Sequence, residues 1–165
     1  SSMSWFKALS LLLLLAVASC GDFKVRTLSG GEFDQIASIQ VVGSSGRIGQ
    51  IYTRQLKDQL MIDPVITPTH RLESKLSVSS ASTLSVVGSS SNLKKMTMSA
   101  SFTLTNLTTG KVELTESIST KATLGAISSY YGQDVSETQG QERLAKLLAD
   151  RVANRMQMFF IDRDN

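Results

Sequence analysis

Apolar and polar residues alternate along the middle of the chain. Between residues 70 and 86 the apolar side chains fall at even positions, namely Leu72, Leu76, Val78, Leu84 and Val86. After a Gly- and Ser-rich break at 88–92 the alternation resumes, with Met96, Met98, Ala100, Phe102 and Leu104 at even positions. A period of two turns one side of a strand towards a core and the other towards water. The pattern predicts two long strands, each with one wet face.

A third strand follows after a tight turn. Residues 106–110 (Asn-Leu-Thr-Thr-Gly) are typical of a hairpin connection, in which Gly110 can adopt a backbone angle that other residues avoid. Val112, Leu114 and Ile118 continue on the same parity, so we expect all three to face the core. Together the three strands predict an antiparallel meander.

Apolar residues spaced by three and four positions predict two helices, at 47–60 and 136–160. The core-facing side of the first helix comprises Ile48, Ile51, Tyr52, Leu56 and Leu60, with Ser44 or Ser45 as its cap. The core-facing side of the second helix comprises Leu144, Leu147, Leu148, Val152, Met156 and Phe159. Its opposite side is basic, with Arg143, Lys146, Arg151 and Arg155, and we expect that side to be solvated.

The remaining segments complete the predicted architecture. Residues 36–42 are rich in strand-forming side chains and predict a first strand, whereas 22–34 and 123–135 are expected to be irregular. Pro64 and Pro68 force an extended connection after the first helix. We therefore expect a single α+β domain at 36–165, in the order strand, helix, three-stranded meander, helix. Both helices should pack on one face of a four-stranded sheet.

The N-terminus has the pattern of a secretory signal. Lys7 precedes an apolar run at 8–18, and small residues then lead to Cys20, the only cysteine. The run is too short for a membrane-spanning helix, which needs about 20 apolar residues. Residues 17–20 (Val-Ala-Ser-Cys) resemble the lipobox of bacterial lipoproteins. An ordinary signal peptide with a chance cysteine, or a buried apolar helix, would also fit the run.

The lipobox resemblance implies removal of residues 1–19 and attachment of diacylglycerol and an N-acyl chain, such as palmitate, to Cys20. Residues 20–35 would then be a lipidated tether that holds the domain at a membrane. The residue after the cysteine is Gly21, and not the Asp that retains lipoproteins in the inner membrane of enteric bacteria. This favours the outer membrane.

Charge and candidate chemistry narrow the function. The chain has 17 basic and 14 acidic residues, without the clustered basic face that nucleic-acid binding requires, so we expect no nucleic-acid partner. The single histidine, His70, is expected to be exposed or at a sheet edge, and no metal-ligand spacing is present. Residues 43–49 (Gly-Ser-Ser-Gly-Arg-Ile-Gly) lack the lysine and spacing of a phosphate-binding loop. No nucleophile motif occurs, so we expect no enzyme activity, cofactor or metal.

Three passages are similar to the LptE family of lipopolysaccharide-assembly lipoproteins, in its alphaproteobacterial type. These are RIGQIYTRQLKDQL at 47–60, MSASFTLTNLTTGKV at 98–112, and the Tyr130-Tyr131 region that leads into an Arg- and Leu-rich last helix. The resemblance implies a non-enzymatic protein on the periplasmic side of the outer membrane. Family members act as plug and assembly partner of the β-barrel LptD, and they contact lipopolysaccharide on its way to the cell surface.

The resemblance also implies basic residues that contact lipopolysaccharide phosphates. Lys94 and Lys95 follow the 88–92 break and are the candidates, although charges that merely solubilise a strand edge would look the same. Between Lys121 and Arg143 there is no Lys or Arg, so a second basic position expected before the last helix is not matched.

Two other functions fit the same pattern. An auxiliary lipoprotein of an ABC-type lipid-transport system would have a similar α/β build and would bind transporter subunits. A periplasmic hydrolase fits less well, because it would need a nucleophile that the sequence does not reveal.

Overall fold

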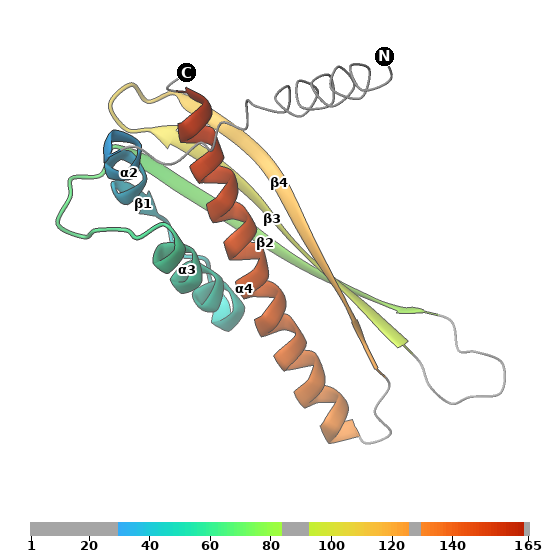
Figure 1. Cartoon of the computed structure of the whole chain (residues 1–165). Coiled ribbons are helices and arrows are strands. Elements are labelled where there is room, and N and C mark those ends of the chain that lie inside the picture. The colour runs from blue at the N-terminus through green and yellow to red at the C-terminus, as the bar shows by residue number, and fades with distance from the viewer. Residues whose placement is uncertain (1–29, 84–92, 126–129, 164–165) are drawn as a thin grey trace, which may run out of the picture.

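The computed structural model describes residues 30–83, 93–125 and 130–163 (Figure 1). The elements are α2 (Gly30–Ala37), β1 (Ile39–Val41), α3 (Gly46–Gln59), β2 (His70–Thr83), β3 (Leu93–Asn106), β4 (Val112–Leu124) and α4 (Tyr130–Arg163). Within these residues the strands form one sheet in the order β1-β2-β3-β4, with β1 parallel to β2 and the other pairs antiparallel. The predicted α+β fold with its meander is confirmed.

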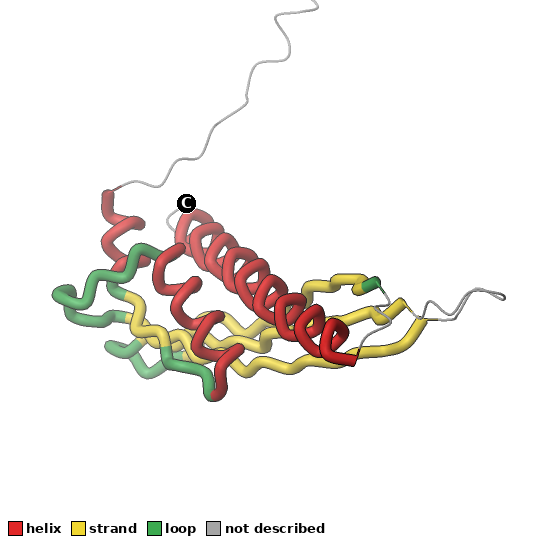
Figure 2. The backbone as a smooth tube through the Cα atoms, turned by 90° about the horizontal axis from the view of Figure 1, so that it is seen from below, coloured by secondary structure: helices red, strands yellow, loops and turns green. Residues whose placement is uncertain are grey.

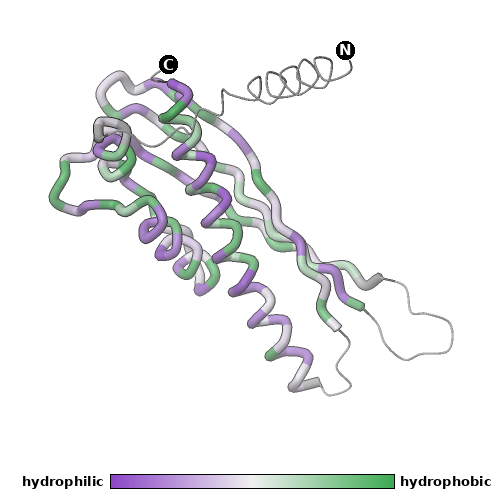
Figure 3. The backbone as a smooth tube through the Cα atoms, viewed as in Figure 1, coloured by the Kyte–Doolittle hydropathy of each residue, from purple (hydrophilic) through white to green (hydrophobic). Residues whose placement is uncertain are grey.

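Helices α3 and α4 cover one face of the sheet, and the other face carries no described helix (Figure 2). The inner face of β3 is the floor of the core, because Met96, Met98, Ala100, Phe102 and Leu104 are all buried. Hydrophilic and hydrophobic residues alternate around α3 and α4 (Figure 3). The hydrophobic side of each helix meets this floor, as a pattern with the helical period requires.

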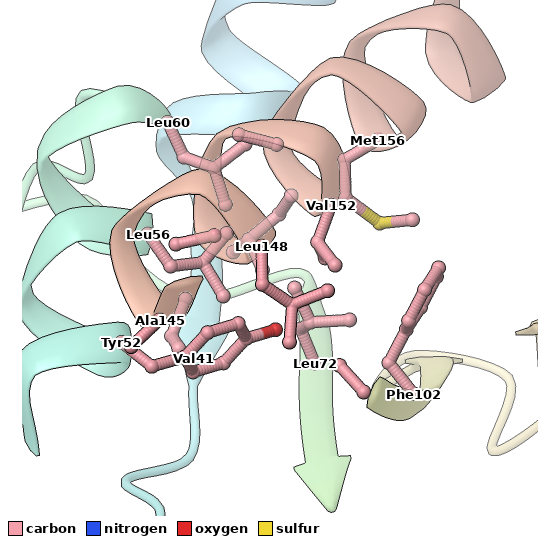
Figure 4. Packing of buried hydrophobic residues seen from close by; sticks show 14 of the residues in the cluster. Val41, Tyr52, Leu56, Leu60, Leu72, Phe102, Ala145, Leu148, Val152 and Met156 are labelled. Atoms are coloured by element: carbon pink, nitrogen blue, oxygen red, sulfur yellow. The ribbon is translucent and has the colours of Figure 1, made fainter. Parts of the chain in front are cut away.

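The two helices meet over the sheet through side chains whose helical spacing predicts a core position. Figure 4 shows Tyr52 and Leu56 of α3 close to Leu148 and Val152 of α4, and all four are fully buried. The small residues Ala145, Ala149 and Ala153 are also buried and let α4 approach closely. One expectation for α4 was wrong, because Leu147 is exposed. Phe159 packs against the core as expected but is only partly buried, and its neighbour Phe160 is fully buried.

Several element boundaries differ from the predicted ones. Helix α4 begins at Tyr130, inside the stretch expected to be irregular, and β4 extends to Leu124. Helix α2 occupies 30–37, where a loop and the start of a strand were expected, and β1 has only three residues. The apolar residues Ile36 and Ala37 are buried in the last turn of α2. A short apolar run does not distinguish a buried strand from a buried helical turn.

A bulge in the β3–β4 hairpin changes the facing of one residue. The register shifts between Leu104 and Thr105, so that Leu114 pairs with Leu104 but Val112 pairs with Thr105. Val112 is 59% exposed, and its predicted core position was wrong. The turn itself is as expected, since the Asn106 carboxamide oxygen accepts the N–H groups of the two threonines that follow it, and Gly110 has a φ of +69°.

Several predictions fall on residues outside the described ranges. They are the signal peptide, the lipobox with Cys20, the apolar positions Leu84 and Val86, and the Gly- and Ser-rich break. Among the described helices none is long and apolar enough to cross a membrane.

Candidate functional site: the open face of the sheet

The uncovered face of the sheet is lined mainly by hydroxyl groups. Strand pairing aligns Ser77 of β2 with Ser99 of β3, and Ser99 in turn with Ser119 of β4. The same face carries further Ser and Thr residues, which are Ser79, Thr97, Ser101, Thr103, Thr105, Thr115, Ser117 and Thr123. Across it, the Ser101 hydroxyl donates to the Ser117 hydroxyl at 3.4 Å. Each hydroxyl can donate and accept hydrogen bonds, so the face suits a wet, polar surface.

The charges on this open face are few and mostly positive. In strand order they are Arg71, Glu73, Lys75, Lys95 and Lys121. Lys95 pairs with Thr123, and Lys121 pairs with Thr97, so the two lysines are diagonal neighbours on adjacent strands. Diagonal neighbours in an antiparallel pair lie roughly 7–8 Å apart. The end of the open face where β3 begins and β4 finishes is therefore basic.

The structure separates Lys94 from Lys95. Lys94 lies on the helix side of β3, where its ammonium is 2.6 Å from a carboxylate oxygen of Glu137 on α4. The hydrogen bond from Lys94 holds the pKa of the Glu137 carboxyl below its ordinary value. Lys95 is exposed on the opposite side of the strand, next to Lys121. The two predicted lysines therefore do not form one site.

The basic side of α4 is also only partly free. Arg155 donates two hydrogen bonds to the carboxylate of Glu116 on β4, one at 2.8 Å and one at 2.6 Å, in a forked arrangement. Arg151 donates to the backbone carbonyl of Ser119 at 3.0 Å. Arg143, Lys146 and Arg151 are exposed, as expected of a solvated side, and only Arg155 is partly covered. Arg151 and Arg155 also fasten α4 to β4.

His70 is buried, with only 3% of its surface exposed, and it lies on β2 between β1 and β3, so the expectation of an exposed or sheet-edge residue was wrong. It lies at the start of β2, where its Nδ1 is 2.8 Å from the Thr69 hydroxyl and its Nε2 is 3.2 Å from Glu113. The Phe160 ring meets it edge-on, and Arg163 lies over that ring. Burial lowers the pKa of His70 below its ordinary value, against the opposing charge of Glu113.

Thr69, His70 and Glu113 form a cluster with the composition of a nucleophile, a base and an acid. The positions of the protons in its hydrogen bonds decide whether it could act as one. The Ser38 hydroxyl donates to the Gln35 carbonyl, and it therefore accepts from Thr69 at 2.6 Å. Thr69 must then accept the proton that His70 carries on Nδ1. In this hydrogen-bond arrangement the Nδ1 atom of His70 has no lone pair free to take the Thr69 proton, and the cluster links distant elements of the fold. It joins α2, β2, β4 and α4 at one end of the domain, with Arg163 also bonded to Gln35.

Surface hollows border α3. One, of about 300 Å³, lies beside the loop at Gly43 and Ser44, and one of about 430 Å³ lies between α3 and α4. The loop turns its polar groups inward, since the Ser44 N–H bonds to Thr53 and the Ser44 hydroxyl bonds to the Ser74 carbonyl. Ser45 takes the N-cap position of α3 without a side-chain capping bond. Among the described residues no three His, Cys, Asp or Glu side chains form a metal-binding group.

The comparisons with known proteins agree with this architecture. The family model for LptE, described as lipopolysaccharide-assembly, matches residues 33–156. A candidate lipoprotein from Caulobacter crescentus CB15 superposes with a TM-score of 0.63 at 20% identity, covering 79% of this chain and 96% of that one. The rare lipoprotein B from Shewanella oneidensis superposes with a TM-score of 0.61 at 13% identity, covering 78% and 98%. No curated protein matches the sequence.

Proposed function

Because the chain belongs to the LptE lipopolysaccharide-assembly family, we propose that it is an outer-membrane lipoprotein that plugs the β-barrel LptD and assists its assembly. In this role it has no catalytic step. It works by occupying the barrel and by helping lipopolysaccharide pass to the cell surface.

The open face of the sheet is the observation that carries the proposal. A barrel interior is polar and wet, so a plug needs a surface that can exchange hydrogen bonds with water and polar side chains. The hydroxyl groups of β2, β3 and β4 offer such a surface with few charges to desolvate. Short Ser and Thr side chains also lose little rotamer freedom when another surface covers them.

Attachment to the membrane is proposed to occur through lipidated Cys20, after cleavage of residues 1–19. Residues 20–29 then connect the anchor to α2. An anchor on the same membrane as the barrel raises the local concentration of the plug beside its partner. The domain can therefore find the barrel without a strong interface of its own.

Contact with lipopolysaccharide is proposed at Lys95, with Lys94 in a supporting role. Lys95 is exposed on the open face next to Lys121, so two ammonium groups could approach one phosphate group. Lys94 already shares its charge with Glu137. We expect Lys95→Ala to weaken lipopolysaccharide binding more than Lys94→Ala. Unchanged binding after both lysines are replaced would remove this part of the proposal.

Purification of the lipidated protein in mild detergent tests the proposed partner. We expect a large outer-membrane β-barrel to co-purify in stoichiometric amount. Recovery of ABC-transporter subunits instead would support the auxiliary-lipoprotein alternative and contradict the plug role. Mass spectrometry of the same material tests the anchor, since Cys20 should be the first residue and should carry acyl chains.

A further inference from the structure

Exposed apolar side chains gather at one end of the domain. They come from α2, from the connection between α3 and β2, and from the β3–β4 hairpin, and they are Phe33, Met61, Val65, Leu107 and Val112. Figure 1 shows these segments together at the end where α4 finishes, opposite the far ends of β2 and β3. An exposed cluster of large apolar residues marks a surface that meets a partner.

Backbone hydrogen bonds hold these segments together. The Leu107 N–H donates to the Thr69 carbonyl at 2.9 Å, which joins the hairpin turn to the α3–β2 connection. The Asp63 N–H donates to the Ala37 carbonyl at 3.1 Å, which joins the same connection to the end of α2. These segments are therefore fastened to one another at this end of the domain, and we call their five exposed apolar residues the apolar end.

The side chains of the most exposed residues of the apolar end are left largely uncovered by the domain itself. Val65 is 89% exposed, and the Asp63 carboxylate fixes its loop by accepting the Val65 N–H at 2.9 Å. Met61 directly follows the C-cap of α3, and its φ of +50° belongs to the closing turn of that helix, in which the N–H groups of Met61 and Ile62 donate to the Asp58 and Lys57 carbonyls; its side chain is 64% exposed. Local hydrogen bonds therefore fix the backbone at both residues, while their apolar side chains stay in solvent.

The apolar end is also where the proposed lipid anchor attaches. Helix α2 begins at Gly30, so about ten residues separate it from Cys20, and they can span at most roughly 35 Å. The strands β2 and β3 have 14 residues each, so their far ends lie about 46 Å from the apolar end. A lipidated Cys20 therefore keeps the apolar end close to the bilayer, whereas the far ends can point away from it.

We propose that the apolar end docks onto the surface of the phospholipid bilayer, an inference that rests on the proposed lipid anchor at Cys20. Aliphatic and aromatic side chains of loops and helix ends insert into the region between headgroups and acyl chains. The nearby Lys111 is exposed and offers a cation to lipid phosphates. A tether supplies a high effective concentration, so a small apolar surface is enough for docking. Docking orients the strands away from the lipid.

Tryptophan fluorescence can test this orientation without a background signal from other tryptophans. The only tryptophan, Trp5, lies in the segment that signal cleavage removes, so a chain starting at Cys20 has none. Cys20 is also the only cysteine, so its thiol can be coupled to a maleimide phospholipid in vesicles. Three variants are compared on such vesicles: Val65→Trp and Leu107→Trp at the apolar end, and Val78→Trp on β2 as the matched control.

The vesicles contain phosphatidylcholine with a fraction of brominated phospholipid, which quenches tryptophan at short range. We expect quenching at positions 65 and 107 to be at least three-fold stronger than at 78, with a blue-shifted emission. Equal quenching at all three positions, or none, would overturn the docking. Because the coupling is chemical, this outcome is independent of whether cells acylate Cys20. That question belongs to the proposed function and is answered by mass spectrometry.

Discussion

Replacement of Gly49 by alanine distinguishes the packing of this fold from simple helix propensity. Gly49 lies inside α3, where alanine normally stabilises a helix by about 0.8–1.0 kcal/mol relative to glycine. The structure predicts the opposite sign. A Cβ atom at this position would lie 2.7 Å from the carbonyl carbon and oxygen of Ser44 and 2.8 Å from its Cβ.

The loop at Ser44 cannot move away without loss. Its N–H bonds to the Thr53 hydroxyl at 3.1 Å, and its own hydroxyl bonds to the Ser74 carbonyl at 3.1 Å. Overpacking of this kind costs about 1–3 kcal/mol, and each hydrogen bond lost adds about 1 kcal/mol. After the gain in helix propensity is subtracted, we expect Gly49→Ala to lower the free energy of unfolding by about 1–3 kcal/mol.

Urea denaturation followed by far-ultraviolet circular dichroism measures this change. Gly31→Ala in α2 is the matched control, because nothing lies within 4 Å of its added Cβ. The control should be neutral or stabilised by up to about 1 kcal/mol. If Gly49→Ala were stabilised like the control, the β1–α3 loop would not pack against α3 as described.

Three further substitutions test other parts of the structure. Leu148→Ala removes a fully buried side chain between α3 and the sheet and should lower the free energy of unfolding by about 2–5 kcal/mol in the same urea assay. Glu116→Gln weakens the forked pair with Arg155, which is about one-third exposed, and should cost no more than about 1 kcal/mol, with the difference shrinking in high salt. Burial lowers the pKa of His70 from 6.5, so the unfolded chain binds the proton first as the pH falls. Thermal melts of the natural chain should therefore show the melting temperature falling as the pH drops below about 6.5. The same melts of His70→Gln should show a weaker pH dependence. Identical pH profiles for the two proteins would contradict the burial of the imidazole.

The meander could be predicted from the sequence because its inner side is continuous and its wet side is polar. Met96 to Leu104 supply an apolar residue at every second position, and a one-residue slip would expose all of them. The two main helices were predictable for a similar reason, since each has one apolar side. Their ends were less certain, because residues such as Gly132 and Gln133 fit a helix or a loop equally well.

Features that depend on distant contacts were not predictable. The burial of His70 results from the β3–β4 hairpin and from the end of α4, which lies more than 90 residues further along the chain. The bulge that exposes Val112 is also a matter of register and not of local sequence. No sequence pattern around His70 or Val112 indicates which distant segments contact them.

The separation of the two lysines was, in contrast, present in the pattern. Lys94 has the parity of the buried Met96, and Lys95 has the parity of the open face. The alternation alone therefore places them on opposite sides of β3. What it could not supply is the register that brings Lys121 next to Lys95, or the reach of Glu137 from α4 to Lys94.

Site-specific photocrosslinking in cells tests the proposed barrel partner most directly. A photoreactive residue in place of Ser99 lies at the centre of the open face, and one in place of Val65 lies at the apolar end. We expect the probe at 99 to form an adduct with a large outer-membrane β-barrel, and the probe at 65 to give little or none. Adducts from position 99 with inner-membrane transporter subunits, or with no protein at all, would contradict it.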